Sequence, residues 1–136
     1  MKRNATAVWS GSGKEGKGVL STQSKTLSQV AYDFRSRFED GSYTNPEELI
    51  AAAHAGCFAM KLSFVLGAAG FVPDSLEATS TVTLESGSIT SSEIVLRAKV
   101  GGIDEATFQK CATEAKEQCP VSKALNMQIS LNAQLV

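Results

Sequence analysis

The chain has 136 residues, enough for one compact domain with its own hydrophobic core, and we expect that domain to span residues 1–136. Its hydrophobic fraction of 43%, charged fraction of 20% and formal net charge of −1 are ordinary for a soluble globular protein. The charges are interspersed, with no basic or acidic block, so this composition argues against nucleic acid and anionic membranes as partners.

The N-terminal sequence MKRNATAVWSGSG carries basic residues but no apolar run, so we expect no secretory signal. The only candidate membrane span, residues 49–72, contains His54 and Lys61 among many alanines and glycines. A lysine near the centre of a span costs about 2.5–3.5 kcal/mol on insertion scales, which weakly apolar residues do not offset. We therefore expect no membrane span.

The chain has an odd number of cysteines, namely Cys57, Cys111 and Cys119. An odd count without a signal peptide argues against a secreted disulfide framework. We expect a reducing, cytoplasmic compartment, in which any disulfide would be transient.

The first elements in chain order are short strands. Residues 5–9 and 19–22 flank the glycine-rich segment GSGKEGKG, residues 11–18, which predicts a hairpin. Further on, alternating apolar and polar residues predict a half-buried strand over residues 32–38. Its polar face would carry Arg35 and Arg37.

A long helix is predicted next, with Asn45 as its N-cap, Pro46 at the first helical position and Glu48 completing a capping box. It should run to about residues 67–70. The helix is apolar nearly all round, so it must be covered on every side. Because one layer of sheet covers one side, we expect a second subunit to cover the rest, in a homodimer.

The remaining elements alternate between strands and helix. Period-two patterns predict strands over residues 76–84 and 94–100, joined by a turn at residues 86–88, and a last strand over residues 127–135. Between them, a helix follows Asp104 and ends near residues 119–120, with a short helical turn to residue 124. Its buried stripe consists of Phe108, Cys111, Ala112 and Ala115. The order of elements predicts an α+β fold with a mainly antiparallel sheet around the long helix.

Cys57 is the first candidate for chemistry, because His54 lies one turn earlier on the same helix face. We expect no zinc site, since Cys111 and Cys119 would be about 12 Å apart along one helix and no CxxC is present. A Cys–His nucleophile for acyl transfer would need an orienting group and an oxyanion hole. Redox chemistry, with Cys119 as a second thiol, would need a stabilised thiolate, for which a nearby arginine suffices.

The segment TNPEELIAAAHAGCFAM, residues 44–60, resembles the signature helix of the OsmC/Ohr family of osmotically inducible and organic-hydroperoxide-resistance thiol peroxidases. YDFRSRFED before it and KEQCPVSKAL after it extend the resemblance over nearly the whole chain. The AAHA form, in place of a Gly-Tyr pair before the cysteine, is similar to the OsmC branch. Tyr43 and Gly56 depart from the family pattern, which could alter the shape of the pocket.

The resemblance implies an OsmC-like fold, an intertwined dimer and a peroxidase. It implies that Cys57 is the peroxidatic cysteine, Cys119 the resolving cysteine, Arg37 the group that stabilises thiolate and peroxide, and Glu47 the partner of that arginine. It also implies an organic hydroperoxide as substrate and an external, lipoyl-type dithiol as reductant, with no metal or prosthetic group. The alternative from another class is a non-enzymatic binding or oligomerisation module.

Glu47 and Cys57 are ten positions apart, about 15 Å of helix rise, which predicts a site shared between subunits. The alternative is a bend in the strand that carries Arg37, which would close this distance within one chain. Cys111 matches no family position, and we expect it to be structural. We interpret His54 as a core or pocket residue.

Overall fold

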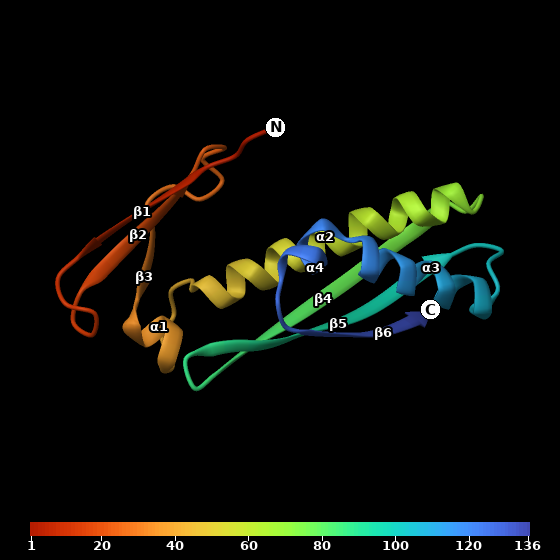
Figure 1. The fold of residues 1–136 in the computed structure, drawn as a ribbon. Helices are drawn as coiled ribbons and strands as arrows, with labels where there is room; N and C mark the ends of the chain where they lie inside the picture. The colour runs from red at the N-terminus through yellow and green to blue at the C-terminus, as the bar shows by residue number, and fades with distance from the viewer. The chain divides into compact units, whose positions relative to one another are not determined.

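The computed structural model describes all residues, 1–136. The chain divides into two compact units, Met1–Leu49 and Ile50–Val136 (Figure 1). The architecture is α+β, with one small sheet in each unit. The fold class is therefore confirmed, whereas a single domain over the whole chain stays a prediction.

The first unit holds the antiparallel sheet β1-β2-β3, formed by Ala5–Ser10, Lys17–Thr22 and Val30–Asp33. The hairpin predicted around the glycine-rich loop is confirmed, with Val8 opposite Val19. Trp9 and Tyr32 lie across this sheet with ring centroids 5.3 Å apart. Gly18 lies between the two strands that carry these rings, and a Cβ there would lie 2.3 Å from the Tyr32 ring, so only glycine fits.

The strand predicted over residues 32–38 is wrong beyond Asp33. Helix α1, Phe34–Phe38, begins there, and Asp33 is its N-cap. The Asp33 carboxylate accepts hydrogen bonds at 2.8 Å from both the backbone N–H and the hydroxyl of Ser36. This local cap satisfies the first turn of a helix, a stronger influence than an alternating pattern only a few residues long.

Helix α2, Pro46–Ala68, begins and ends where the sequence predicted. Asn45 Oδ1 accepts the Glu48 N–H at 2.8 Å, as an N-cap does. The predicted capping box is incomplete, because the Glu48 carboxylate accepts instead from the Thr44 hydroxyl at 2.8 Å. At the other end Gly70 has φ of +91°, and the Phe71 N–H reaches the Leu66 carbonyl at 2.9 Å, which closes the helix.

The second unit holds the sheet β4-β5-β6, formed by Pro73–Glu85, Ser88–Val100 and Gln128–Leu135. β4 and β5 are antiparallel, as predicted, whereas β6 pairs parallel to β5. A parallel neighbour needs a crossover connection. Here α3, Glu105–Gln118, and the short α4, Pro120–Ala124, supply that connection (Figure 1).

The core lies on the face of this sheet that α2 and α3 cover. It gathers buried side chains of α2, β5 and α3, namely Phe58, Leu62, Val65, Leu66, Ile94, Leu96, Ala98, Val100, Phe108, Cys111, Ala112, Ala115 and Cys119. Each large apolar side chain in such a core contributes about 1.5–3 kcal/mol by leaving water. The buried stripe predicted for α3 is confirmed, and Cys111 belongs to it.

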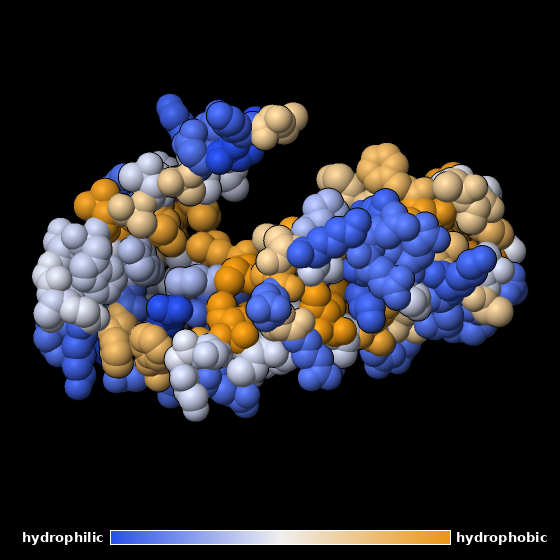
Figure 2. Space-filling model, viewed as in Figure 1, coloured by the Kyte–Doolittle hydropathy of each residue, from blue (hydrophilic) through white to orange (hydrophobic).

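The outward face of α2 remains apolar and exposed. Met60 is 66% exposed and Phe64 is 70% exposed. In Figure 2 hydrophilic side chains cover the solvent side of α3, whereas apolar side chains lie along the C-terminal half of α2. By length and composition α2 could cross a membrane, a test that core helices of soluble proteins also pass. The expectation of no membrane span stays a prediction.

Candidate functional site

Two thiols from distant parts of the chain meet in the second unit. Cys57 lies on α2, and Cys119 lies between α3 and α4, where it is fully buried. Both are free cysteines, and their Sγ atoms are 3.0 Å apart and share a hydrogen bond. The chain between α3 and α4 therefore brings together two residues 62 positions apart.

Burial raises the pKa of the Cys57 thiol, and the hydrogen bond with Cys119 raises it further. The backbone N–H of Val121 acts in the opposite direction but is outweighed. A thiol with a raised pKa has little nucleophilic thiolate at neutral pH. If Cys57 is to attack an oxidant, it needs a positive charge from elsewhere in the protein.

Burial also acts to raise the pKa of Cys119, but hydrogen bonds from Cys57 and from the Ser122 backbone and hydroxyl outweigh it. The pKa of Cys119 therefore lies below its usual value. The hydrogen bond between the two sulfurs acts on the two pKa values in opposite directions, raising that of Cys57 and lowering that of Cys119. Within this pair we regard Cys119 as the more acidic thiol, because two backbone N–H groups and a hydroxyl stabilise its anion.

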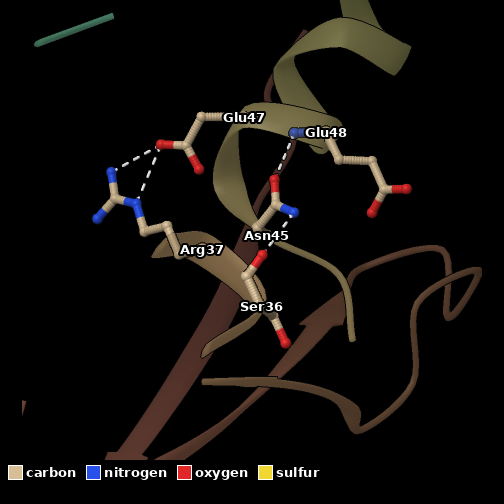
Figure 3. A network of polar contacts seen from close by, with 5 residues as sticks. All are labelled: Ser36, Arg37, Asn45, Glu47 and Glu48. Carbon is tan, nitrogen blue, oxygen red and sulfur yellow. Dashed lines mark hydrogen bonds and ion pairs between the residues drawn. The ribbon is translucent and has the colours of Figure 1, made fainter. Parts of the chain in front are cut away.

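An ion pair occupies the first unit, where Arg37 of α1 meets Glu47 of α2 (Figure 3). Arg37 Nε and Nη2 donate to the same oxygen, Glu47 Oε1, at 3.0 and 2.8 Å. The other oxygen, Oε2, is buried without a hydrogen-bond partner. The Arg37 guanidinium also lies 5.2 Å from the centroid of the Phe38 ring.

Local hydrogen bonds fix α1 against the start of α2. The Asn45 amide donates to the Ser36 carbonyl at 3.0 Å (Figure 3). The Tyr43 N–H donates to the Ser36 hydroxyl at 3.2 Å. Gly41 packs so closely on Ser36 that a Cβ would lie 2.4 Å from its backbone nitrogen. The turn between the two helices is therefore tightly specified, and with it the direction of Arg37.

The helical form of α1 separates the two candidate arginines. Residues two apart share a strand face, but on a helix they point in widely different directions. Arg35 pairs with Glu39 at 3.5 Å on the exposed surface, whereas Arg37 pairs with the buried Glu47. The ion pair implied by the family resemblance is present, and the catalytic roles of its members stay predictions.

His54 is fully buried and fully hydrogen-bonded. Its Nδ1 lies 2.7 Å from the Ser92 hydroxyl and its Nε2 lies 2.8 Å from the Ser122 hydroxyl. Ser92 in turn lies 2.9 Å from Ser80 on the neighbouring strand. Because both ring nitrogens are engaged by serines, neither is free to act as the base of a Cys57–His54 acyl-transfer pair.

These serines do not stand out as a group in the sequence. Ser80 lies on the apolar face predicted for its strand, and continuing the alternation of the next strand backwards places Ser92 on the same face. Ser122 lies in the CPVS motif. A buried hydroxyl needs a hydrogen-bond partner, so a serine on the apolar face of a predicted strand was the signal in the sequence that pointed to a buried polar group. The structure gathers no group of three or more His, Cys, Asp or Glu side chains that could hold a metal ion.

The fold and the paired thiols define a small α+β dithiol protein. The chain belongs to the OsmC-like protein family, whose model matches residues 39–134. It is 45% identical over 139 residues to Peroxiredoxin OsmC of Escherichia coli K12, covering 99% of this chain and 97% of that protein. It is also 33% identical over 103 residues to Organic hydroperoxide resistance protein-like 1 of Staphylococcus epidermidis, covering 71% of this chain and 74% of that protein.

Solved structures show the same fold at low sequence identity. An OsmC like protein from Mycoplasma pneumoniae aligns with a TM-score of 0.78 at 14% identity, covering 100% of this chain and 98% of that one. An organic hydroperoxide resistance protein OsmC from Legionella pneumophila aligns with a TM-score of 0.71 at 23% identity, covering 99% and 96%. The OsmC-like fold is therefore confirmed.

Proposed function

We propose that this protein is a cytoplasmic, thiol-dependent peroxidase that reduces organic hydroperoxides to alcohols in defence against oxidative and osmotic stress. The observation that carries the proposal is the contact of two free thiols, Cys57 and Cys119, at 3.0 Å in an apolar environment. The names of the relatives, a peroxiredoxin and an organic hydroperoxide resistance protein-like sequence, support the same chemistry.

In the first step the Cys57 thiolate attacks one oxygen of the hydroperoxide. The O–O bond breaks, the alkoxide leaves and takes up a proton to become the alcohol, and Cys57 becomes a sulfenic acid. In the second step the Cys119 sulfur attacks the Cys57 sulfur. The thiol proton of Cys119 and the hydroxyl of the sulfenic acid leave as water, and a Cys57–Cys119 disulfide forms. An external dithiol, of the lipoyl type implied by the resemblance, returns both thiols by exchange.

Arg37 is proposed to supply the positive charge that Cys57 lacks within its own unit. A guanidinium always carries its charge and opposes the rise in thiol pKa that burial causes. Glu47 would hold that guanidinium in one orientation through its two hydrogen bonds. No metal or prosthetic group takes part in this scheme.

The functional molecule is proposed to be a homodimer. The exposed apolar face of α2, with Met60 and Phe64, is what a second copy of the chain would cover. The arginine of one subunit would then serve the Cys57 of the other. The test is to refold Arg37→Ala and Cys57→Ser proteins together, which should recover partial activity in heterodimers. Verified heterodimers without any recovery would contradict the sharing of sites.

The central experiment measures peroxide consumption with a dithiol reductant, comparing cumene hydroperoxide with hydrogen peroxide. Wild-type protein should consume the organic peroxide faster, whereas Cys57→Ser should be inactive. Cys119→Ser should oxidise once and accumulate sulfenic acid or over-oxidised products. Cys111→Ser is the matched control, a buried thiol outside the pair, and should turn over normally. Full dithiol-dependent turnover by Cys57→Ser would refute the proposal.

A further inference from the structure

Two side chains of α2, one helical turn apart, contact the segment that begins α4. The Cys57 sulfur lies 3.0 Å from the Cys119 sulfur, and His54 Nε2 lies 2.8 Å from the Ser122 hydroxyl. Cys119 is the N-cap of α4, and Ser122 lies three residues later in the same short helix. Within the second unit, a contact between thiols and a hydrogen bond therefore join α2 to α4 side by side (Figure 1).

The bond between His54 and Ser122 is the only hydrogen bond that joins a side chain of α4 to α2 or to the sheet. Val121 packs against the core, but an apolar contact has no preferred direction. The Cys119 N–H bonds to the Ala115 carbonyl at the end of α3, yet the Cys119 backbone is extended, with ψ of 123°, so α3 does not continue into α4. The hydrogen bond at Ser122 therefore fixes the direction in which α4 leaves Cys119.

His54 is itself held in place from the side of the sheet. Its Nδ1 lies 2.7 Å from the Ser92 hydroxyl of β5, and Ser92 lies 2.9 Å from the Ser80 hydroxyl of β4. His54 and Ser92 are fully buried, so water does not compete for these hydrogen bonds. The planar imidazole therefore acts as a rigid spacer that carries the position of the sheet to Ser122 on α4.

We propose that His54 holds Cys119 in position for disulfide formation by fixing α4 through Ser122. The two sulfurs are 3.0 Å apart and need to approach by only about 1 Å to reach the length of a disulfide bond. Without the bond at Ser122, α4 has more orientations, and Cys119 spends less of its time this close to Cys57. The effective concentration of one thiol at the other then falls. His54 forms no hydrogen bond with either reacting sulfur, so it is a positioning residue.

Disulfide exchange with glutathione separates positioning from simple stabilisation of the fold. Cys57 and Cys119 together give two electrons and two protons to oxidised glutathione, one S–S bond forms in the protein, and two molecules of reduced glutathione leave. An interaction of equal strength in the dithiol and disulfide forms cancels from this equilibrium, whereas one that brings the sulfurs together does not. This exchange does not depend on the proposed peroxidase function, on which only the role of His54 in turnover rests.

The first experiment measures the reduction potential of the Cys57–Cys119 pair in glutathione buffers, in a Cys111→Ser background that leaves no third thiol. Ser122→Ala should lower the effective concentration of the pair about tenfold, which raises the two-electron potential by about 30 mV. Ser92→Ala is the matched control, because it also leaves one imidazole nitrogen without a partner but keeps the bond to α4. It should lower the stability of the fold and leave the potential unchanged. Equal potentials in the two variants would overturn the proposal.

Two further variants keep the test decisive if Ser122→Ala does not fold. His54→Asn keeps a polar atom near the position of Nδ1 and has none near that of Nε2, so it should bind Ser92, lose Ser122 and raise the potential by about 30 mV. Ser122→Thr keeps the hydroxyl and should keep the wild-type potential. A folded His54→Asn protein with the wild-type potential would overturn the proposal, as would a rise of about 30 mV in Ser122→Thr.

The second experiment follows a single turnover with one equivalent of cumene hydroperoxide. Ser122→Ala should slow formation of the Cys57–Cys119 disulfide about tenfold, because that step needs Cys119 in place, while sulfenic acid formation at Cys57 stays within about twofold of wild type. Equal slowing of both steps would contradict a role specific to Cys119. If wild-type protein consumes no peroxide, the proposed function fails, and the potentials in glutathione still decide the role of His54.

Discussion

Lowering the pH should destabilise this protein through one histidine. His54 is the only histidine in the chain and is fully buried. Burial lowers its pKa below the ordinary value of 6.5, so the folded protein resists protonation at a pH where the unfolded chain accepts it. The contribution of His54 to stability is therefore complete above about pH 6.5 and is lost as the pH falls from there to the lower folded-state pKa.

The magnitude follows from proton counting. Below the unfolded pKa of 6.5 and above the folded pKa, the unfolded state binds about one proton more than the folded state. The free energy of unfolding then falls by about 1.4 kcal/mol for each pH unit. Asp33 and Asp104 also have lowered pKa values, because hydrogen bonds from Ser36 and Thr107 respectively stabilise their carboxylates. Their ordinary value is 3.8, so they lose their contribution only at more acidic pH.

The assay is urea unfolding at fixed protein concentration, repeated from about pH 7.5 down to about pH 5. The free energy of unfolding of wild-type protein should fall with pH at this slope. His54→Gln should be less stable at neutral pH, but its free energy of unfolding should be nearly constant across the same range. A wild-type stability that does not change over this range would refute the reasoning. So would an equal slope in the variant, since it has no histidine left to titrate.

Three further predictions concern the serine hydroxyls around His54, the Arg37–Glu47 ion pair and the exposed apolar face of α2. Ser92→Ala should cost about 2–3 kcal/mol in urea unfolding, more than Ser80→Ala, because it leaves a buried imidazole nitrogen without a partner; equal costs would contradict this. Arg37→Lys should slow peroxide consumption about tenfold or more, since lysine has no planar pair of nitrogens to donate to Glu47 Oε1, while Arg35→Lys on the exposed side of α1 should not. Phe64→Glu should shift the proposed dimer to monomers in sedimentation, and a wild-type monomer would remove the basis for a dimer.

Local signals in the sequence were sufficient for most elements. Asn45 and Gly70 mark the ends of α2 because capping depends on a few adjacent residues. The long strands β4 and β5 form where apolar and polar residues alternate in the sequence, because each strand buries one face. The short segment after Asp33 could not be assigned in this way, because five residues are too few to distinguish the period of a strand from that of a helix. There the Asp33 side-chain cap decides in favour of a helix.

The sequence by itself identified the candidate reactive residues, and the tertiary structure decided which of them lie in contact. Cys57 and Cys119 could be named from spacing and resemblance, but their contact depends on the return of the chain through α3 to α2. The serines around His54 come from separate strands and a helix, so no local pattern shows that they share one imidazole. Hydrogen bonds act over about 3 Å in space, whatever the separation along the chain, and only packing brings such groups within that distance.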